Sequence, residues 1–142
     1  MNTLHIATAC LLNPQHEILL VRKKGSRFWM LPGGKLDAGE TASQALLREL
    51  SEELQWQAPA AMFHHLGDFE NQAANEANTL VKAQVFIAAL ATTPSLHIAA
   101  EIDAMQWRDV RREGEQENLA PLLREQVIPA VIAHLQHCAQ PA

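Results

Sequence analysis

The sequence is poor in the features that mark several classes of protein. It has only two cysteines, Cys10 and Cys138, which lie far apart and lack the spacing of a metal site or a disulfide framework. Two isolated thiols fit a reducing compartment, so we expect a cytoplasmic protein. No apolar stretch is long enough to span a membrane, and residues 1–12 lack the basic start of a signal peptide. We therefore predict that the protein has no membrane partner.

The sequence also lacks an excess of positive charge. Its 11 Lys and Arg residues against 16 Asp and Glu residues give a net charge of −5, which argues against a nucleic-acid polymer as partner. A nucleotide remains possible, because a bound metal neutralises phosphates locally. With 48% hydrophobic and 19% charged residues, the 142-residue chain has the composition of a globular protein. We predict one domain over residues 1–142.

A glycine-rich loop at residues 33–40 leads directly into a stretch with the pattern of an amphipathic helix. Thr41 and Gln44 have the spacing of a capping box, which predicts that the helix starts there. Apolar residues then recur at the spacing of one helical face. The helix also carries three acids at positions i, i+3 and i+4, which places them side by side: Glu49, Glu52 and Glu53.

Glu53 projects into the apolar arc of this helix, and Glu49 lies at the margin of the arc. A carboxylate that points inward is costly unless it is paired or binds a metal. A hard cation such as Mg²⁺ prefers oxygen ligands and usually keeps water and substrate phosphate in its shell. A solvated acidic face is the common alternative, and the preceding glycine loop favours the metal site.

The spacing of this stretch resembles the Nudix box of pyrophosphohydrolases that act on nucleoside diphosphates linked to another group. The resemblance rests on Gly34, five residues, Glu40, seven residues, and then the run of residues 48–53, Arg-Glu-Leu-Ser-Glu-Glu. The box continues with a glycine that ends the helix in a left-handed conformation. Gln55 stands at that position, which leaves the end of the helix open and the acids untouched.

The resemblance implies an α/β fold, a Nudix-type α/β/α sandwich with a mixed, mostly antiparallel curved sheet between helices. It implies hydrolysis of a phosphoanhydride with Mg²⁺ as cofactor and Mn²⁺ as a possible substitute. The implied metal ligands are the carbonyl of Gly33 and the carboxylates of Glu49, Glu52 and Glu53. A carboxylate must also accept the proton of the attacking water, and we expect Glu52 or Glu53 first and Glu101 second.

Other residues of the loop and of a basic strand end are candidates for supporting roles. We expect Gly34, Glu40 and Arg48 to brace the loop against the helix. In MutT-like members an arginine at the position of Arg22 meets substrate phosphates, and a solvated strand end is an equal alternative for it. Lys35 is a plausible phosphate contact, although loop lysines are commonly only solvated.

Two further residues are candidates for recognising the substrate. Glu76, in a polar segment at residues 70–78 that we expect to be a loop, could reach a nucleotide or stay solvated. Asn118 precedes the last predicted helix, where MutT-like proteins place an asparagine that reads a purine. A capping role explains Asn118 equally well. Pro129 should kink or divide that last helix.

The remaining pattern predicts strands on either side of the box. Residues 4–12 and 18–21 form a predicted hairpin around a turn, and residues 80–90 form a long strand. Glu101 should lie just before a strand that carries Trp107, a segment similar to one in Nudix proteins. The alternative for Glu101 is a solvated acid at the entrance of that strand.

The substrate is less well defined by the sequence. There is no tyrosine in the chain, so the tyrosine found beyond the box in diadenosine-polyphosphate hydrolases is absent. The proline associated with ADP-ribose enzymes is also missing at its expected distance, because Pro59 is too close to the box. Size and Arg22 favour a nucleoside triphosphate, including a damaged one. The alternatives are a nucleotide sugar or ADP-ribose-like substrate, and a non-catalytic nucleotide-sensing module. We expect a monomer or a homodimer.

Overall fold

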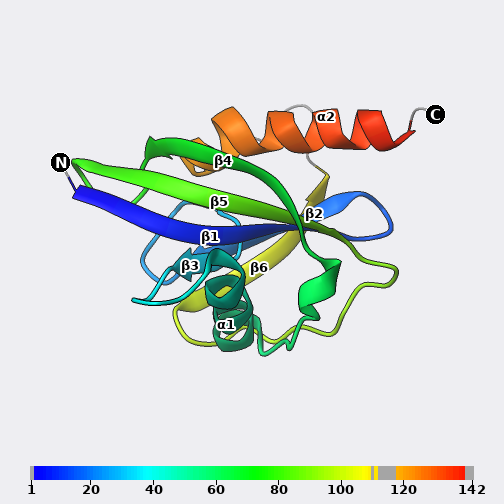
Figure 1. Ribbon diagram of the computed structural model, residues 1–142, viewed down its shortest axis with the longest axis horizontal. Helices are drawn as coiled ribbons and strands as arrows, with labels where there is room; N and C mark the ends of the chain where they lie inside the picture. Colours follow the sequence, from blue (N-terminus) through cyan, green and yellow to red (C-terminus); the bar gives the residue numbers. More distant parts are fainter. Residues whose placement is uncertain (1, 110, 112–117, 140–142) are drawn as a thin grey trace.

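A computed structural model describes residues 2–109, 111 and 118–139, and for residues 137–139 it describes the backbone alone. The centre of the fold is a six-stranded sheet with the strand order β4-β5-β1-β2-β6, in which β3 also pairs with β1 (Figure 1). The strands are β1 (Asn2–Leu12), β2 (Glu17–Lys23), β3 (Gly33–Lys35), β4 (His64–Gln72), β5 (Thr79–Ala89) and β6 (Ile102–Asp109).

The sheet is mixed, because β1 and β5 run parallel while the other pairs are antiparallel. The predicted hairpin is present, with Leu12 of β1 opposite Ile18 of β2. The long strand predicted at residues 80–90 is β5, and the strand that carries Trp107 is β6.

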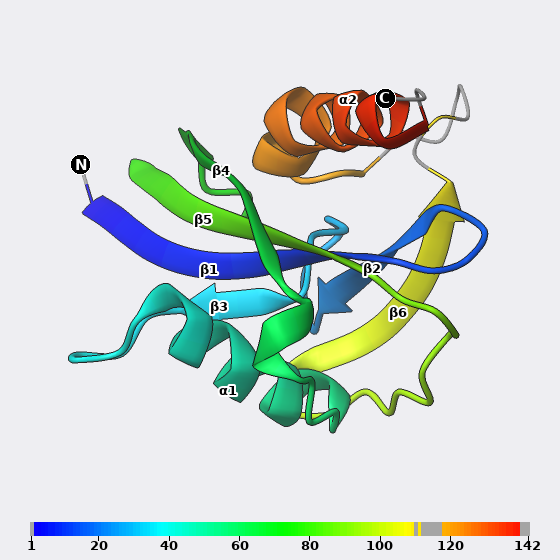
Figure 2. The ribbon, with the colours of Figure 1, turned by 45° about the vertical axis from the view of Figure 1, so that its right-hand side comes forward.

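Helices cover both faces of this sheet (Figures 1 and 2). Helix α1 (Ala42–Leu54) packs on one face, and a π-helical segment (Leu123–Val127) followed by α2 (Ile128–Ala139) packs on the other. Neighbouring strand residues point to opposite faces of the sheet. Cys10 therefore belongs to the core between the sheet and the last helical stretch, and Leu11 belongs to the core between the sheet and α1. The predicted α/β/α arrangement is therefore confirmed.

Helix α1 begins as the sequence predicts and ends in a conformation that glycine normally adopts. Thr41 Oγ1 accepts a hydrogen bond from the Gln44 N–H, and the Gln44 side chain accepts one from the Thr41 N–H, which completes the capping box. Gln55 caps the other end with φ = 51°, in the left-handed region, and its N–H donates to the Ser51 carbonyl. The helix thus ends at the box position although the residue there has a side chain.

Two local predictions are wrong, each because of tertiary pairing. Residues 70–72 are not loop but the end of β4, since Gln72 pairs with Leu80 across the edge of the sheet and backbone hydrogen bonds hold this polar segment. Asn118 does not cap the last helix, which begins at Pro121. Asn118 has φ = 59°, and its carbonyl instead accepts the N–H of Trp29.

The last helical stretch runs without a break over residues 121–139, and it changes from π-helix to α-helix just before Pro129. The N–H of Ile128 donates to the carbonyl of Leu123, five residues back, in a single π turn. A proline ring collides with the carbonyl four residues earlier in regular α-helix, and a wider turn relieves this collision. Among the described residues, no helix has the length and apolar character needed to cross a bilayer.

Candidate active site

The site is built where β3 meets α1, and two glycines permit this close approach. Gly33 has φ = 139°, and a Cβ there would lie 2.1 Å from the carbonyl oxygen of Ala7 on β1. A Cβ at Gly34 would lie 2.5 Å from Cδ of Glu49. Any side chain at these positions would push β3 from β1 or Glu49 from its place.

Glu53 is a buried acid at the centre of this contact. Its side chain points inward from α1, the residue is only 5% exposed, and Oε1 accepts the N–H of Gly33 at 3.1 Å. Burial raises the pKa of Glu53 from its ordinary 4.5 to about 7, because the charged form loses water. The charges of Glu49 and Glu101 raise this pKa further, while the Gly33 N–H and Lys23 oppose the shift.

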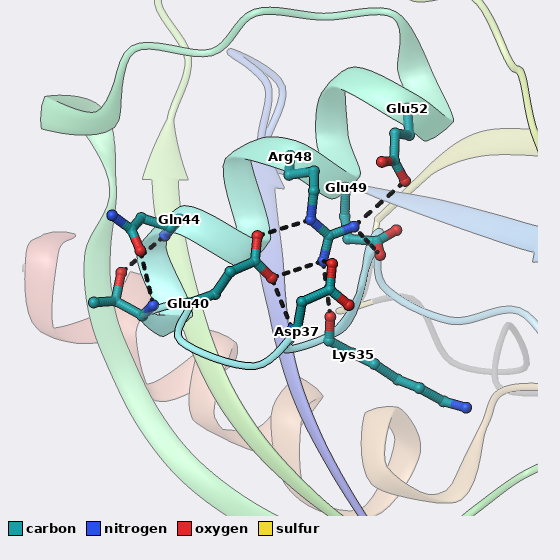
Figure 3. Close-up of polar contacts among 8 residues, drawn as sticks. Lys35, Asp37, Glu40, Gln44, Arg48, Glu49 and Glu52 are labelled. Carbon is teal, nitrogen blue, oxygen red and sulfur yellow. Dashed lines mark hydrogen bonds and ion pairs between the residues drawn. The ribbon is translucent and has the colours of Figure 1, made fainter.

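Arg48 joins the glycine loop to α1 (Figure 3). Its Nε and Nη2 donate to the two carboxylate oxygens of Glu40 at 2.8 and 2.9 Å, and Nη2 also donates to the Lys35 carbonyl at 3.0 Å. The hydrogen bond from Arg48 lowers the pKa of Glu40 to about 2, and the N–H of Asp37 adds to this effect. The same contacts raise the pKa of Arg48. This pairing fixes the loop to the helix at two points.

The other two box acids lie beside the same guanidinium group. Arg48 Nη1 donates to Glu49 Oε1 at 2.9 Å and lies 3.5 Å from Glu52 Oε2 (Figure 3). The Glu49 side chain is 17% exposed and that of Glu52 is 53% exposed. The three acids therefore range from buried to open along one side of α1, and Arg48 balances part of their charge.

These acids line a cavity of about 1000 Å³. Glu101 lies in the same lining, held by a hydrogen bond from the Lys24 N–H to its carbonyl at 2.8 Å. Glu76, from the segment between β4 and β5, also lines the cavity. The structure thus brings together eight of the predicted residues, which are Gly33, Gly34, Lys35, Glu49, Glu52, Glu53, Glu76 and Glu101.

Arg22 is not among the residues that line this cavity. Its Nε lies 3.3 Å from Asp103 Oδ1, and its guanidinium carbon lies 5.0 Å from the ring centre of Trp29. Lys23 and Lys24 line the cavity instead. The run of three cations at residues 22–24 was the feature of the sequence that could have identified these two lysines. Which of them faces the acids depends on the pairing of β2 with β6, where the register shifts between Arg22 and Lys23. Asn118 does not line the cavity either.

The acids present fit a hard divalent cation in their chemistry. Glu49, Glu52 and Glu53 supply only oxygen donors from one helix face, next to a glycine backbone, as Mg²⁺ prefers. In the part of the chain that the structure describes, no three His, Cys, Asp or Glu side chains converge closely enough to hold an ion as they lie. As they lie, Glu49 accepts a hydrogen bond from Arg48 and Glu53 accepts one from the N–H of Gly33.

Comparison with known proteins places this site in a family. A family model described as the NUDIX domain matches residues 3–130. A Myxococcus xanthus protein named octanoyltransferase is 34% identical over 114 residues, which are 78% of this chain and 31% of that protein. A Bacillus subtilis (strain 168) protein named putative 8-oxo-dGTP diphosphatase is 44% identical over 52 residues, which are 37% of this chain and 35% of that protein. The chain thus spans about a third of the length of these curated relatives.

A solved structure of similar fold extends over nearly the whole chain. The MutT protein from Methanosarcina mazei Go1 superposes with a TM-score of 0.75 and 20% identity, over 98% of this chain and 97% of that one. This likeness shows the fold, and the family match covers both the glycine loop and the acidic face of α1. The chain belongs to the Nudix family.

Proposed function

We propose that the protein is a Mg²⁺-dependent pyrophosphohydrolase that cleaves a phosphoanhydride bond of a nucleoside diphosphate linked to another group. The observation that carries this proposal is the charge pattern of the large cavity. Glu49, Glu52 and Glu53 on α1 line the same cavity as Lys23, the last residue of β2, and Lys24, which follows it. A metal held on the acids, together with the lysines of the same cavity, would suit a chain of phosphates, because the negative charge of phosphates is the main obstacle to their hydrolysis.

Each group in the cavity then has a chemical role. Glu49, Glu52, Glu53 and the Gly33 carbonyl would hold the ion, and Mn²⁺ would be an alternative to Mg²⁺. When bound, the ion would neutralise phosphate oxygens and favour ionisation of water. Lys23, Lys24 and Lys35 would bind the remaining phosphate charge. Arg48 and Glu40 would hold the glycine loop against the acidic face of α1.

The proton of the attacking water passes to a carboxylate of this cavity. Glu53 is one candidate for this base, because its buried carboxylate points into the site from α1 and accepts the N–H of Gly33. Glu52 is the more open neighbour on the same helix, and Glu101, just before β6, lines the same cavity. Comparison of the Glu52→Gln, Glu53→Gln and Glu101→Gln variants assigns the role, since loss of the base lowers kcat at saturating Mg²⁺.

We further propose that the substrate is a nucleoside triphosphate, including an oxidised deoxynucleotide. The name of the B. subtilis relative supports this choice. An assay of Mg²⁺-dependent formation of nucleoside mono- or diphosphate, separated from the substrate by chromatography, should compare dGTP, 8-oxo-dGTP, dCTP, UDP-glucose and ADP-ribose. We expect the highest kcat/KM with a triphosphate. A higher value for UDP-glucose or ADP-ribose would reject this substrate class and leave the reaction type intact.

The decisive variant for the reaction itself is Glu53→Gln. We expect it to fold and to lose about 100-fold or more in kcat, because an inward carboxylate is removed from the metal and water. Glu70→Gln is the matched control, since Glu70 on β4 pairs with Lys82 at 3.7 Å and does not line the cavity. Undiminished turnover by Glu53→Gln would overturn the assignment. Nucleotide binding without turnover by the wild-type protein would instead identify a sensing module.

A further inference from the structure

A second, smaller cavity adjoins the charged one. Its volume is about 160 Å³, and the two share lining residues from the end of β2, from β3 and from the segment before β5. Its walls come from the face of β1 that carries Ile6 and Thr8 and from the start of the last helical stretch, where Leu122 and Leu123 lie. Most of these walls are aliphatic. Any ligand that occupies both cavities has a charged part and an uncharged part.

The size of the smaller cavity restricts what it can hold. Sites for whole drug-sized ligands occupy about 300–1,000 Å³, so 160 Å³ admits only a fragment, such as a heterocyclic ring. Lys23, Gly33 and Lys35 line both cavities and therefore stand at the junction between them. A ring in the small cavity would place attached phosphates in the large one.

One buried polar side chain in this lining has no hydrogen-bond partner. Thr8 is 5% exposed, and its Oγ1 atom is buried without a hydrogen-bond partner among the described residues. Burial of an unpaired hydroxyl is costly, whereas valine has nearly the same shape and suits a strand better. On the same face of β1, the neighbours Ile6 and Cys10 belong to the apolar core. The hydroxyl of Thr8 is therefore unexplained by packing.

We propose that Thr8 is a specificity-determining residue. Its side chain lines the smaller cavity with Oγ1 closed off, and rotation about the Cα–Cβ bond turns the hydroxyl into the cavity, where it forms a hydrogen bond with the nucleobase of the bound nucleotide. This inference rests on the proposed function, because it takes the phosphates to lie in the charged cavity. A hydroxyl donates one hydrogen bond through its O–H and accepts hydrogen bonds at its oxygen, so it can pair with a ring carbonyl, a ring nitrogen or an amino group. The aliphatic walls contact the faces of the ring and select for its size. Thr8 selects for a polar group on its edge.

The test measures binding and not turnover. Calorimetry in Mg²⁺ buffer compares dGMP, 8-oxo-dGMP, dCMP and deoxyribose 5-phosphate, none of which contains an anhydride bond to be hydrolysed. For the base that binds the wild-type protein most tightly, we expect Thr8→Val to weaken binding about three- to tenfold, as for loss of one net hydrogen bond. Thr8→Ser should keep wild-type affinity. Deoxyribose 5-phosphate, which has no base, should bind all variants equally.

Thr79→Val is the matched control on the neighbouring strand. Thr79 is 2% exposed, donates its hydroxyl proton to the Ala77 carbonyl at 3.0 Å and lines neither cavity. We expect this variant to lower the unfolding midpoint and to leave nucleotide binding unchanged. Thr8→Val should keep or raise the midpoint, because the hydroxyl that it removes has no partner.

Equal affinity of the wild-type and Thr8→Val proteins for every base would overturn the proposal. So would an equal loss with deoxyribose 5-phosphate, a similar loss in Thr79→Val, or a lower unfolding midpoint for Thr8→Val. The two proposals fail separately. Binding that depends on Thr8 without any hydrolysis removes only the proposed activity, whereas hydrolysis without an effect of Thr8 removes only this inference.

Discussion

Replacement of Glu53 by glutamine should stabilise the metal-free protein at alkaline pH. Glu53 is 5% exposed, and burial raises its pKa from 4.5 to about 7. Between these pH values the folded protein keeps a proton that the unfolded chain releases. The free energy of unfolding therefore falls as pH rises from 4.5 to 7, and this contribution is fully present only below pH 4.5.

The size of the effect follows from the two pKa values. At about 1.36 kcal/mol for each pH unit between 4.5 and 7, ionisation of Glu53 costs the folded state about 3 kcal/mol. Glutamine has the same shape, carries no charge at any pH and offers an oxygen to the Gly33 N–H that now binds Glu53 Oε1. Glu53→Gln should match the wild-type protein near pH 4.5 and exceed it by about 3 kcal/mol at pH 8. This difference is a large part of the free energy of unfolding of a typical protein, which is about 5–15 kcal/mol.

Urea unfolding in EDTA, followed by tryptophan fluorescence at pH 4.5 and pH 8, measures this difference. The two proteins differ only at residue 53, so the comparison isolates Glu53. Glu70→Gln, at the exposed ion pair with Lys82, should show the same small difference at both pH values. If the difference in free energy of unfolding between Glu53→Gln and wild type is the same at pH 4.5 and pH 8, then burial does not raise the pKa of Glu53, and the reasoning fails.

Two further predictions concern the glycine positions of the box. Gln55→Gly should stabilise the protein by about 0.5–1 kcal/mol, because glycine adopts the left-handed conformation at φ = 51° without strain. Urea unfolding checks this, with Gln57→Gly, outside the left-handed region, as a control that should not gain stability. Gly34→Ala should lower kcat about 10- to 100-fold, because its added carbon would lie 2.5 Å from Cδ of Glu49 and displace that acid. Gly39→Ala, whose added carbon meets nothing within 4 Å but whose φ of 83° strains alanine, should lose stability and keep its kcat, and equal activity of Gly34→Ala would contradict the placement of Glu49.

The sequence was sufficient for the features that depend on neighbours along one helix. The capping box predicts the start of α1, and the i, i+3, i+4 spacing predicts that Glu49, Glu52 and Glu53 share one side of it. The position of Glu53 inside the apolar arc predicts its burial, which the structure confirms. Helical periodicity is set by local geometry, so no knowledge of the rest of the fold is needed.

Strand predictions depend on distant partners and were less complete. Residues 70–72 look like loop by composition, and only their pairing with β5 makes them strand. Asn118 looks like a cap by its place, and only its contact with Trp29 shows that its backbone has another partner. Local patterns do not report which segment from elsewhere in the chain supplies the hydrogen bonds.

The box at residues 33–55 was therefore determined by the sequence, while the surroundings of the box were decided by the tertiary structure. The spacing of its glycines and acids is a local property, and it predicts metal and phosphate chemistry. The register of β2 with β6 decides that Lys23 lines the charged cavity and that Arg22 pairs with Asp103. The packing of β1 under the last helical stretch leaves Thr8 buried without a partner beside that cavity. A shift of one residue in a strand moves a side chain to the opposite face of the sheet, and long-range pairing sets that register.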